Sequence, residues 1–176
     1  MRAFIGIETG SAQGELWGAA TYIAQLSGGR AARKNNIHLT VKFLGEVGDI
    51  RNIARAMDTV CNASRDFYLE LDDLVFMNRL KIVWCSVAGD TKALQTLRDG
   101  IEGALAGCGF EREDRPYRPH ITLVRGAYKN WDMQDVKLEK RIFKVTGLTL
   151  FESVSQNGEL IYVPRYVSEF GGTDDG

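Results

Sequence analysis

The sequence predicts an α+β fold made of two related halves. Period-2 alternation and helical spacing of apolar residues give the order strand, helix, strand, helix, two strands, helix and three strands. Each half holds a strand, a helix, a charged connector and a strand that carries His-x-Thr. This repetition indicates two similar lobes around a pseudo-twofold axis. We expect one two-lobed domain over residues 1–170 and a disordered tail over residues 171–176.

The elements of the first half follow from the spacing of their apolar residues. Strands are predicted at residues 3–7, 36–45 and 67–72, and helices at residues 16–26 and 50–61. Residues that favour turns and caps lie at the ends of these elements. Thr9-Gly10-Ser11 forms a turn with a candidate cap. Gly28-Gly29 ends the first helix, and Asp49 is a candidate cap for the second. A basic connector, residues 30–34, precedes the second strand.

The second half is predicted in the same way. Strands are expected at residues 80–87, 120–125, 142–151 and 159–163, and a helix at residues 90–106. The glycines of Gly107-Cys108-Gly109 are typical of a helix C-terminus, and Asn157-Gly158 is typical of a hairpin turn. A charged loop, residues 111–118, and a polar connector, residues 128–140, separate these elements. Residues 167–170 extend the last strand beyond Pro164 in this prediction.

The composition is that of an ordinary globular protein, with 44% hydrophobic and 26% charged residues. The net charge of −1 creates no overall basic field, so a polyanion has to meet a local basic patch. The first apolar run is too short for a signal peptide, and no later run could span a bilayer. Cys61, Cys85 and Cys108 lack metal-site spacing and are expected to be reduced and buried. We therefore expect a cytoplasmic protein without metal, cofactor or membrane partner.

The strand at residues 36–45 is the most informative stretch. Ile37, Leu39, Val41 and Phe43 alternate with polar residues, which predicts one core face and one open face. The open face would carry His38, Thr40 and Lys42 in a row. By the same alternation Phe43 and Leu44 belong to the core, although Phe43 is also kept as a candidate substrate-binding residue.

A second strand repeats this pattern with the only other histidine of the chain. In His120-Ile121-Thr122 the imidazole and the hydroxyl again share a face. Ideal alternation puts Arg125 on the opposite face, so Arg125 could reach a shared substrate only if a bulge or the strand end turns it. Either motif alone means little, because strand histidines are usually structural. Together the two motifs contain both histidines of the chain.

Two imidazoles that face one cleft suit displacement at phosphorus. A neutral histidine can take a proton from the attacking oxygen while a protonated one donates to the leaving oxygen. A threonine hydroxyl on the same face can donate to a phosphate oxygen. Basic residues cluster near each motif and could bind the negative charge of a phosphate, or they could simply form a solvated surface. They are Arg30, Arg33, Lys34 and Lys42 near the first motif, and Arg112, Arg115, Arg118, Arg125 and Lys129 near the second.

Tyr117, Tyr128 and Trp131 lie in loops beside the second motif. Their rings could stack on a nucleic-acid base, or they could serve ordinary packing.

At these residues the chain resembles the two-histidine phosphoesterases, and within them the RNA 2′,3′-cyclic phosphodiesterase, or 2′-5′ RNA ligase-like, group. The family's paired motifs match His38-Leu39-Thr40-Val41 and His120-Ile121-Thr122-Leu123. The flanking residues are also similar, namely Asn36-Ile37, the run from Lys42 to Val47, Arg118-Pro119, Val124-Arg125 and the opening run from Arg2 to Ile7. The resemblance extends from about Met1 to Val163.

The resemblance implies a bilobal α+β fold with two antiparallel sheets that line a central groove. It implies metal-independent hydrolysis of a terminal 2′,3′-cyclic phosphate to a 2′-phosphate, with His38 as the proton donor and His120 as the base. Thr40 and Thr122 would bind phosphate oxygens, with Arg125 as a further candidate. The expected partners are RNA ends or nucleotide cyclic phosphates, including tRNA halves, which some relatives join through a 2′-5′ linkage. We expect a monomer.

Two alternatives stay open. The protein could be a nucleotide- or RNA-binding module without catalysis, or a phosphodiesterase for a small cyclic nucleotide or 2′-5′ oligoadenylate.

Overall fold

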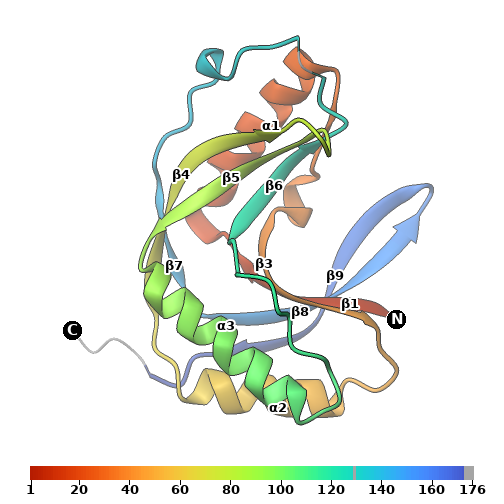
Figure 1. Cartoon of the computed structure of the whole chain (residues 1–176), viewed down its shortest axis with the longest axis vertical. Helices are drawn as coiled ribbons and strands as arrows, with labels where there is room; N and C mark the ends of the chain where they lie inside the picture. Colours follow the sequence, from red (N-terminus) through yellow and green to blue (C-terminus); the bar gives the residue numbers. More distant parts are fainter. Residues whose placement is uncertain (129, 173–176) are drawn as a thin grey trace.

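The computed structural model describes residues 1–128 and 130–172, which form two antiparallel sheets (Figure 1). The four-stranded sheet has the order β3 (His38–Glu46), β1 (Arg2–Glu8), β8 (Gly147–Gln156) and β9 (Glu159–Glu169). The five-stranded sheet has the order β2 (Arg30–Ala31), β6 (His120–Arg125), β5 (Ile82–Gly89), β4 (Phe67–Met77) and β7 (Ile142–Val145). The predicted α+β fold with two antiparallel sheets is therefore confirmed.

The α-helices are α1 (Gln13–Ser27), α2 (Arg51–Asn62) and α3 (Thr91–Ala106). Two of the three α-helices pack on the sheet to which the preceding strand does not belong, whereas α2 packs on β8 and β9 of the sheet that holds its preceding strand, β3. Helix α1 follows β1 but packs against β2 and β6, whereas α3 follows β5 but packs against β3 and lies beside α2 (Figure 1). This exchange ties the two sheets together. Short 3₁₀ turns are η1 (Gly10–Ala12), η2 (Lys34–Asn36) and η3 (Met133–Asp135).

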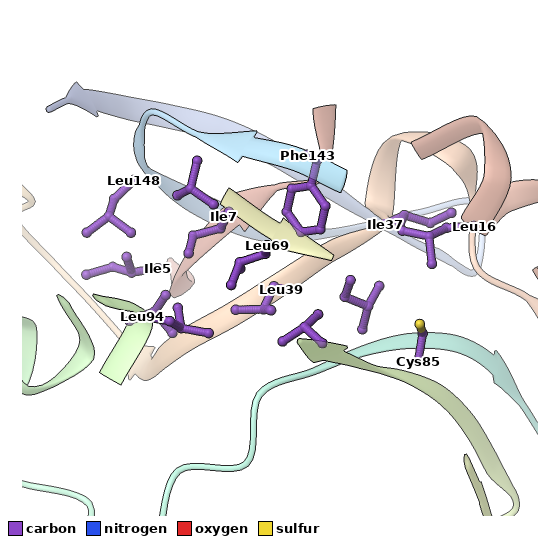
Figure 2. Packing of buried hydrophobic residues seen from close by; sticks show 14 of the residues in the cluster. Ile5, Ile7, Leu16, Ile37, Leu39, Leu69, Cys85, Leu94, Phe143 and Leu148 are labelled. Atoms are coloured by element: carbon purple, nitrogen blue, oxygen red, sulfur yellow. The ribbon is translucent and has the colours of Figure 1, made fainter. Parts of the chain in front are cut away.

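One hydrophobic core joins both sheets. Ile5 and Leu39 from the four-stranded sheet lie near Leu69 of β4 and Leu94 of α3, and all four side chains are fully buried (Figure 2). Phe143 of β7 lies in the same cluster. Because apolar side chains of both sheets share this core, the backs of the two motif strands, β3 and β6, are held by the same packing.

The predicted strand at residues 142–151 is wrong in one respect, because it is two strands in different sheets. Residues up to Val145 pair with β4, and residues from Gly147 onward pair with β9 and then also with β1. A Cβ atom on Gly147 would collide with the carbonyl oxygen of Ser168, so only glycine fits this crossing point. The apolar alternation continues through the crossing, which is why the sequence pattern does not reveal it.

The other ends and turns agree with expectation in most cases. Gly28 ends α1 with a φ of 72°, and Asp90 caps α3 by accepting a hydrogen bond from the backbone N–H of Ala93. Asp49 accepts from the backbone N–H of Arg51 at 2.9 Å, but it precedes the N-cap of α2, which is Ile50 and has no side-chain capping hydrogen bond. The Asn157-Gly158 turn joins β8 to β9, and β9 runs past Pro164 as expected.

Three local expectations differ from the structure. The Thr9-Gly10-Ser11 turn does not supply the expected cap, because Thr9 at the start of η1 and Ala12 at the start of α1 make no side-chain capping hydrogen bond. The connector at residues 30–34 contains the short strand β2. The backbone N–H groups of Gly171 and Gly172 donate to the carbonyls of Cys61 and Ser64, so the first two residues of the expected tail are hydrogen-bonded. The rest of that tail, residues 173–176, lies outside the described residues.

Candidate active site

A β-bulge in β3 changes which side chains reach the groove. The pairing with β1 steps from Ile5↔Lys42 to Gly6↔Thr40, so Val41 is the extra residue. Val41 and Lys42 are consequently both buried. The prediction that Lys42 shares a face with His38 and Thr40 is therefore wrong.

The same bulge brings Phe43 to the face of the motif. Phe43 is 75% exposed and lies opposite Phe4, whose ring contacts that of His38 in a tilted arrangement. The expectation that Phe43 belongs to the core is thus wrong, whereas Leu44 is buried as predicted. Its position keeps Phe43 a candidate for substrate contact.

Strand β6 has a bulge at the equivalent place. The pairing with β5 steps from Trp84↔Thr122 to Val83↔Val124, so Leu123 is the extra residue. Val124 is buried and Arg125 is exposed, as Lys42 and Phe43 are in β3. The bulge returns Arg125 to the face of His120 and Thr122, which resolves the parity conflict of ideal alternation.

Both imidazole rings are oriented by the backbone in the same way. Nδ1 of His38 lies 2.6 Å from the carbonyl oxygen of Asn36, and Nδ1 of His120 lies 2.8 Å from that of Arg118. A carbonyl only accepts, so each Nδ1 carries the hydrogen and each Nε2 is left for proton transfer. Nε2 of His38 also lies 2.8 Å from the hydroxyl oxygen of Thr40.

An aromatic ring supports each histidine. The ring centroids of Phe4 and His38 are 4.6 Å apart, and those of Trp84 and His120 are 4.5 Å apart. Gly6 makes room for the first pair, because a Cβ atom there would lie 3.2 Å from Cδ2 of His38. The sequence reasoning missed Phe4 and Trp84, since nothing in their local pattern distinguishes them from other strand aromatics.

The two motifs face each other across the sheets. Strands β3 and β6 are in contact although they belong to different sheets, and the hydroxyl of Tyr117 donates to the carbonyl oxygen of Thr40 at 2.8 Å. Burial lowers the pKa of His38, and the positive charges of His120 and Arg125 lower this pKa further, against the raising effect of the Asn36 hydrogen bond. His38 of the first motif is thus close enough to His120 and Arg125 of the second for their charges to act on it.

Lys42 has a structural partner instead of a place in the groove. Its Nζ lies 2.9 Å from Oε1 of Glu102 on α3 and donates to the carbonyl of Glu111 at 2.9 Å. The other oxygen of Glu102 accepts from the backbone N–H of Glu113 at 3.1 Å. This buried network fixes the loop that leads to His120 against the strand that carries His38. The alternation of the sequence gave no sign of it.

The loop aromatics have different surroundings. Tyr117 is half-buried with its hydroxyl bonded to β3, and Trp131 packs edge-on against Phe76 at 5.7 Å. Both positions fit the packing alternative. Tyr128 is 63% exposed.

Several charges and thiols have ordinary surroundings. Among the basic residues near the motifs, Arg33 pairs with Glu159 and Arg115 with Glu113, and Lys129 lies outside the described residues. Cys61 and Cys85 are buried free thiols, as expected, and Cys108 is half-buried.

Within residues 1–128 and 130–172 no group of three or more His, Cys, Asp or Glu side chains is arranged to hold a metal ion, and no helix is long and apolar enough to cross a membrane.

Comparison with known proteins agrees with this arrangement. The family model described as the 2′-5′ RNA ligase superfamily matches residues 12–156, which is most of the chain and includes both motifs. The chain belongs to the 2′-5′ RNA ligase superfamily. A curated relative, the RNA 2′,3′-cyclic phosphodiesterase of Escherichia coli strain K12, is 30% identical over 145 residues, which cover 77% of each protein.

Solved structures of other proteins have the same fold as this member of the 2′-5′ RNA ligase superfamily. The crystal structure of E. coli LigT complexed with 3′-AMP matches with a TM-score of 0.74 and 26% identity over 96% of this chain and 97% of the other. The protein TT0787 of Thermus thermophilus matches with a TM-score of 0.81 and 19% identity, over 98% and 99% of the two chains. At that identity the second likeness concerns the fold alone.

Proposed function

We propose that the protein hydrolyses the 2′,3′-cyclic phosphate at an RNA end to a 2′-phosphate, with His38 and His120 as the catalytic acid and base. One observation carries this proposal. Two contacting strands each hold an imidazole whose Nδ1 is fixed by a backbone carbonyl, which leaves Nε2 for proton transfer. The names of the curated relatives support the substrate class.

The expected reaction balances with two proton transfers. Nε2 of His120 accepts a proton from water while the water oxygen attacks phosphorus. The bond from phosphorus to O3′ breaks, and O3′ takes the proton carried by Nε2 of His38. The pentacovalent arrangement is most negative at its non-bridging oxygens, where Thr40 and Thr122 donate hydrogen bonds and Arg125 supplies a positive charge. Bound phosphate also offsets the cationic neighbours of His38, which favours its protonated form.

The geometry fits Arg125 and Phe43 to different parts of the substrate. Arg125 acts electrostatically on His38 and so suits the scissile phosphate. Phe43 is an exposed ring on the face of the first motif and suits contact with the nucleoside. Phosphate binding by side chains alone requires no metal, and turnover is expected to persist in EDTA.

The test is replacement of each histidine by alanine. His38→Ala and His120→Ala should each lower kcat on a 2′,3′-cyclic phosphate by about 10²–10⁴-fold, because each removes one proton transfer. Thermal unfolding of each variant checks that the fold is kept. Unchanged turnover in either variant would contradict the paired mechanism.

A substrate panel separates the proposal from its rivals. RNA ends, cyclic mononucleotides and 2′-5′ oligoadenylate are compared, and the position of the product phosphate is determined. Production of a 2′-phosphate from RNA ends supports the proposal. Tight binding without any product would instead indicate a binding module, and turnover confined to the small esters would replace RNA as the substrate.

A further inference from the structure

Strand β2 places a second arginine beside Arg125. The register of β2 and β6 sets Arg30 directly opposite Arg125, and the next pair is Ala31↔Val124. Directly opposite residues of an antiparallel pair point to the same face, with their Cα atoms about 4.5–5.5 Å apart. Arg30 therefore lies on the groove face, at the edge of the five-stranded sheet.

This pairing is electrostatically unfavourable unless an anion joins it. Like charges at directly opposite positions destabilise a sheet. Both side chains are exposed, and in the described part of the chain no carboxylate lies within ion-pairing distance of either guanidinium. Five other exposed arginines have a carboxylate partner, in the pairs Arg33–Glu159, Arg51–Asp49, Arg115–Glu113, Arg141–Glu139 and Arg165–Glu152. Other exposed arginines, such as Arg55 and Arg79, also have no ion pair within the described residues, so what distinguishes Arg30 and Arg125 is that they lie directly opposite each other.

The two arginines differ in their distance from the reaction centre. Arg125 and His120 are the cations whose charges lower the pKa of His38, and Arg30 is not among them. Arg30 also lies one strand further out than Arg125, and neighbouring strands are about 4.8 Å apart. Arg125 is thus available to the scissile phosphate, while Arg30 is left for an anion beside it.

We propose that Arg30 binds the phosphodiester on the 5′ side of the terminal nucleotide, so that the protein selects oligonucleotide ends over mononucleotides. The guanidinium suits this ligand because its planar fork can hold two phosphate oxygens at once. A cyclic mononucleotide has no such phosphodiester and gains nothing from Arg30. The inference rests on the proposed function for its kinetic test, but the binding of Arg30 to the phosphodiester can be measured without turnover.

The kinetic test compares a 2′,3′-cyclic mononucleotide with a dinucleotide that ends in a 2′,3′-cyclic phosphate. Arg30→Gln should lower kcat/KM for the dinucleotide about tenfold, because it removes a charge-assisted hydrogen bond. The mononucleotide value should stay within about twofold of wild type, since the proposal assigns its only phosphate to Arg125 and leaves Arg30 without a ligand. Arg51→Gln, which removes an exposed arginine on α2, is the matched control and should leave both values unchanged.

The binding test uses dinucleotides and mononucleotides with a terminal 3′-phosphate. Wild type should bind the dinucleotide more tightly, and Arg30→Gln should remove that advantage. The log–log salt dependence for the dinucleotide should become shallower by about 0.7 in the variant, as expected for one lost contact to a single strand.

The outcomes are separable. Equal losses on both substrates, or no loss on either, would overturn the assignment of Arg30. If the wild-type protein hydrolyses neither substrate, the proposed function fails, while the binding ratio still decides whether Arg30 holds the added phosphodiester.

Discussion

His38 and His120 share a backbone hydrogen bond but not an environment. His38 lies among the rings of Phe4, Phe151 and Tyr162, with centroids 4.6, 5.9 and 5.2 Å away. Burial is the main reason why its pKa is lowered from the ordinary value of 6.5. The neutral form of His38 is therefore favoured in the folded protein without substrate, and a bound phosphate has to supply the negative charge that favours protonation.

The first residue-scale prediction concerns this pKa. NMR titration should place the pKa of His38 below 6.5. Arg125→Gln should raise that pKa, because removal of a nearby positive charge makes the protonated ring less costly. Arg30→Gln should leave it unchanged, since Arg30 is not among the charges that act on His38. A His38 pKa that does not respond to Arg125→Gln would contradict the placement of Arg125 beside the reaction centre.

The same shift has a consequence for stability. Because the folded pKa lies below the unfolded one, the contribution of His38 is fully present above pH 6.5 and is lost as the pH falls through the folded pKa. This loss should be absent in His38→Gln, whose side chain does not titrate in this range.

At the scale of elements, the two motif strands use the same construction. Each has a bulge directly after the threonine, at Val41 in β3 and at Leu123 in β6. Two buried residues therefore follow each other in each strand, and the side chain after them lies on the groove face again. Phe43 and Arg125 occupy equivalent places. The two half-sites are therefore alike in backbone and in histidine orientation but differ in chemistry, with an aromatic ring on one side and a cation on the other.

Asn36 connects a second element, the β8–β9 hairpin, to His38. Its side chain donates to the carbonyl of Leu160 at 2.9 Å and accepts from the backbone N–H of Tyr162 at 3.1 Å, much as a neighbouring strand would. Its own carbonyl accepts from Nδ1 of His38. The ring of Tyr162 in turn meets His38 edge-on. One residue thus fixes the hairpin and the histidine relative to each other.

Replacement of Asn36 tests this connection. Asn36→Ala should lower the free energy of unfolding by roughly 1–3 kcal/mol, at about 0.5–1.5 kcal/mol for each of two hydrogen bonds. The amide of Tyr162 should exchange faster with deuterium, and kcat should fall because the ring of His38 is less well fixed. The neighbouring Asn35→Ala is the control, since Asn35 makes no side-chain hydrogen bond within the described residues. Unaltered exchange at Tyr162 would show that Asn36 does not hold the hairpin.

At the scale of the whole molecule, the groove depends on contacts between the two sheets. The Lys42–Glu102 pair is buried, with side chains 7% and 5% exposed, and it joins β3 to α3 and to the loop before β6. Burial makes the pair sensitive to loss of one partner, because a single charge left behind is poorly solvated. Arg98 lies 3.7 Å from Glu102 and gives the carboxylate a second, more distant cation.

Double replacement distinguishes this pair from simple packing. Lys42→Met should lower the free energy of unfolding by about 3 kcal/mol, the lower end of the range for a broken buried pair, because Glu102 keeps Arg98 as a cation. Adding Glu102→Gln should recover part of that loss, because it removes the buried negative charge that Lys42→Met leaves without its nearest cation. Denaturant unfolding measures Lys42→Met, Glu102→Gln and the double variant. A double variant whose loss equals or exceeds the sum of the two single losses would mean that the charges do not act as a pair.

Residues close together in the chain are enough to predict the alternation, the helices, the hairpin turn and the two His-x-Thr motifs. The remaining features depend on how distant parts of the chain pair and pack. Lys42 lies outside the groove, and Phe43 and Arg125 lie on its face, because of the two bulges. These positions could not be predicted, since a bulge forms only when a strand is paired with its neighbour. Likewise, the split of residues 142–151 between two sheets and the facing of β3 and β6 depend on which distant strands pair and pack, and no local pattern contains that information.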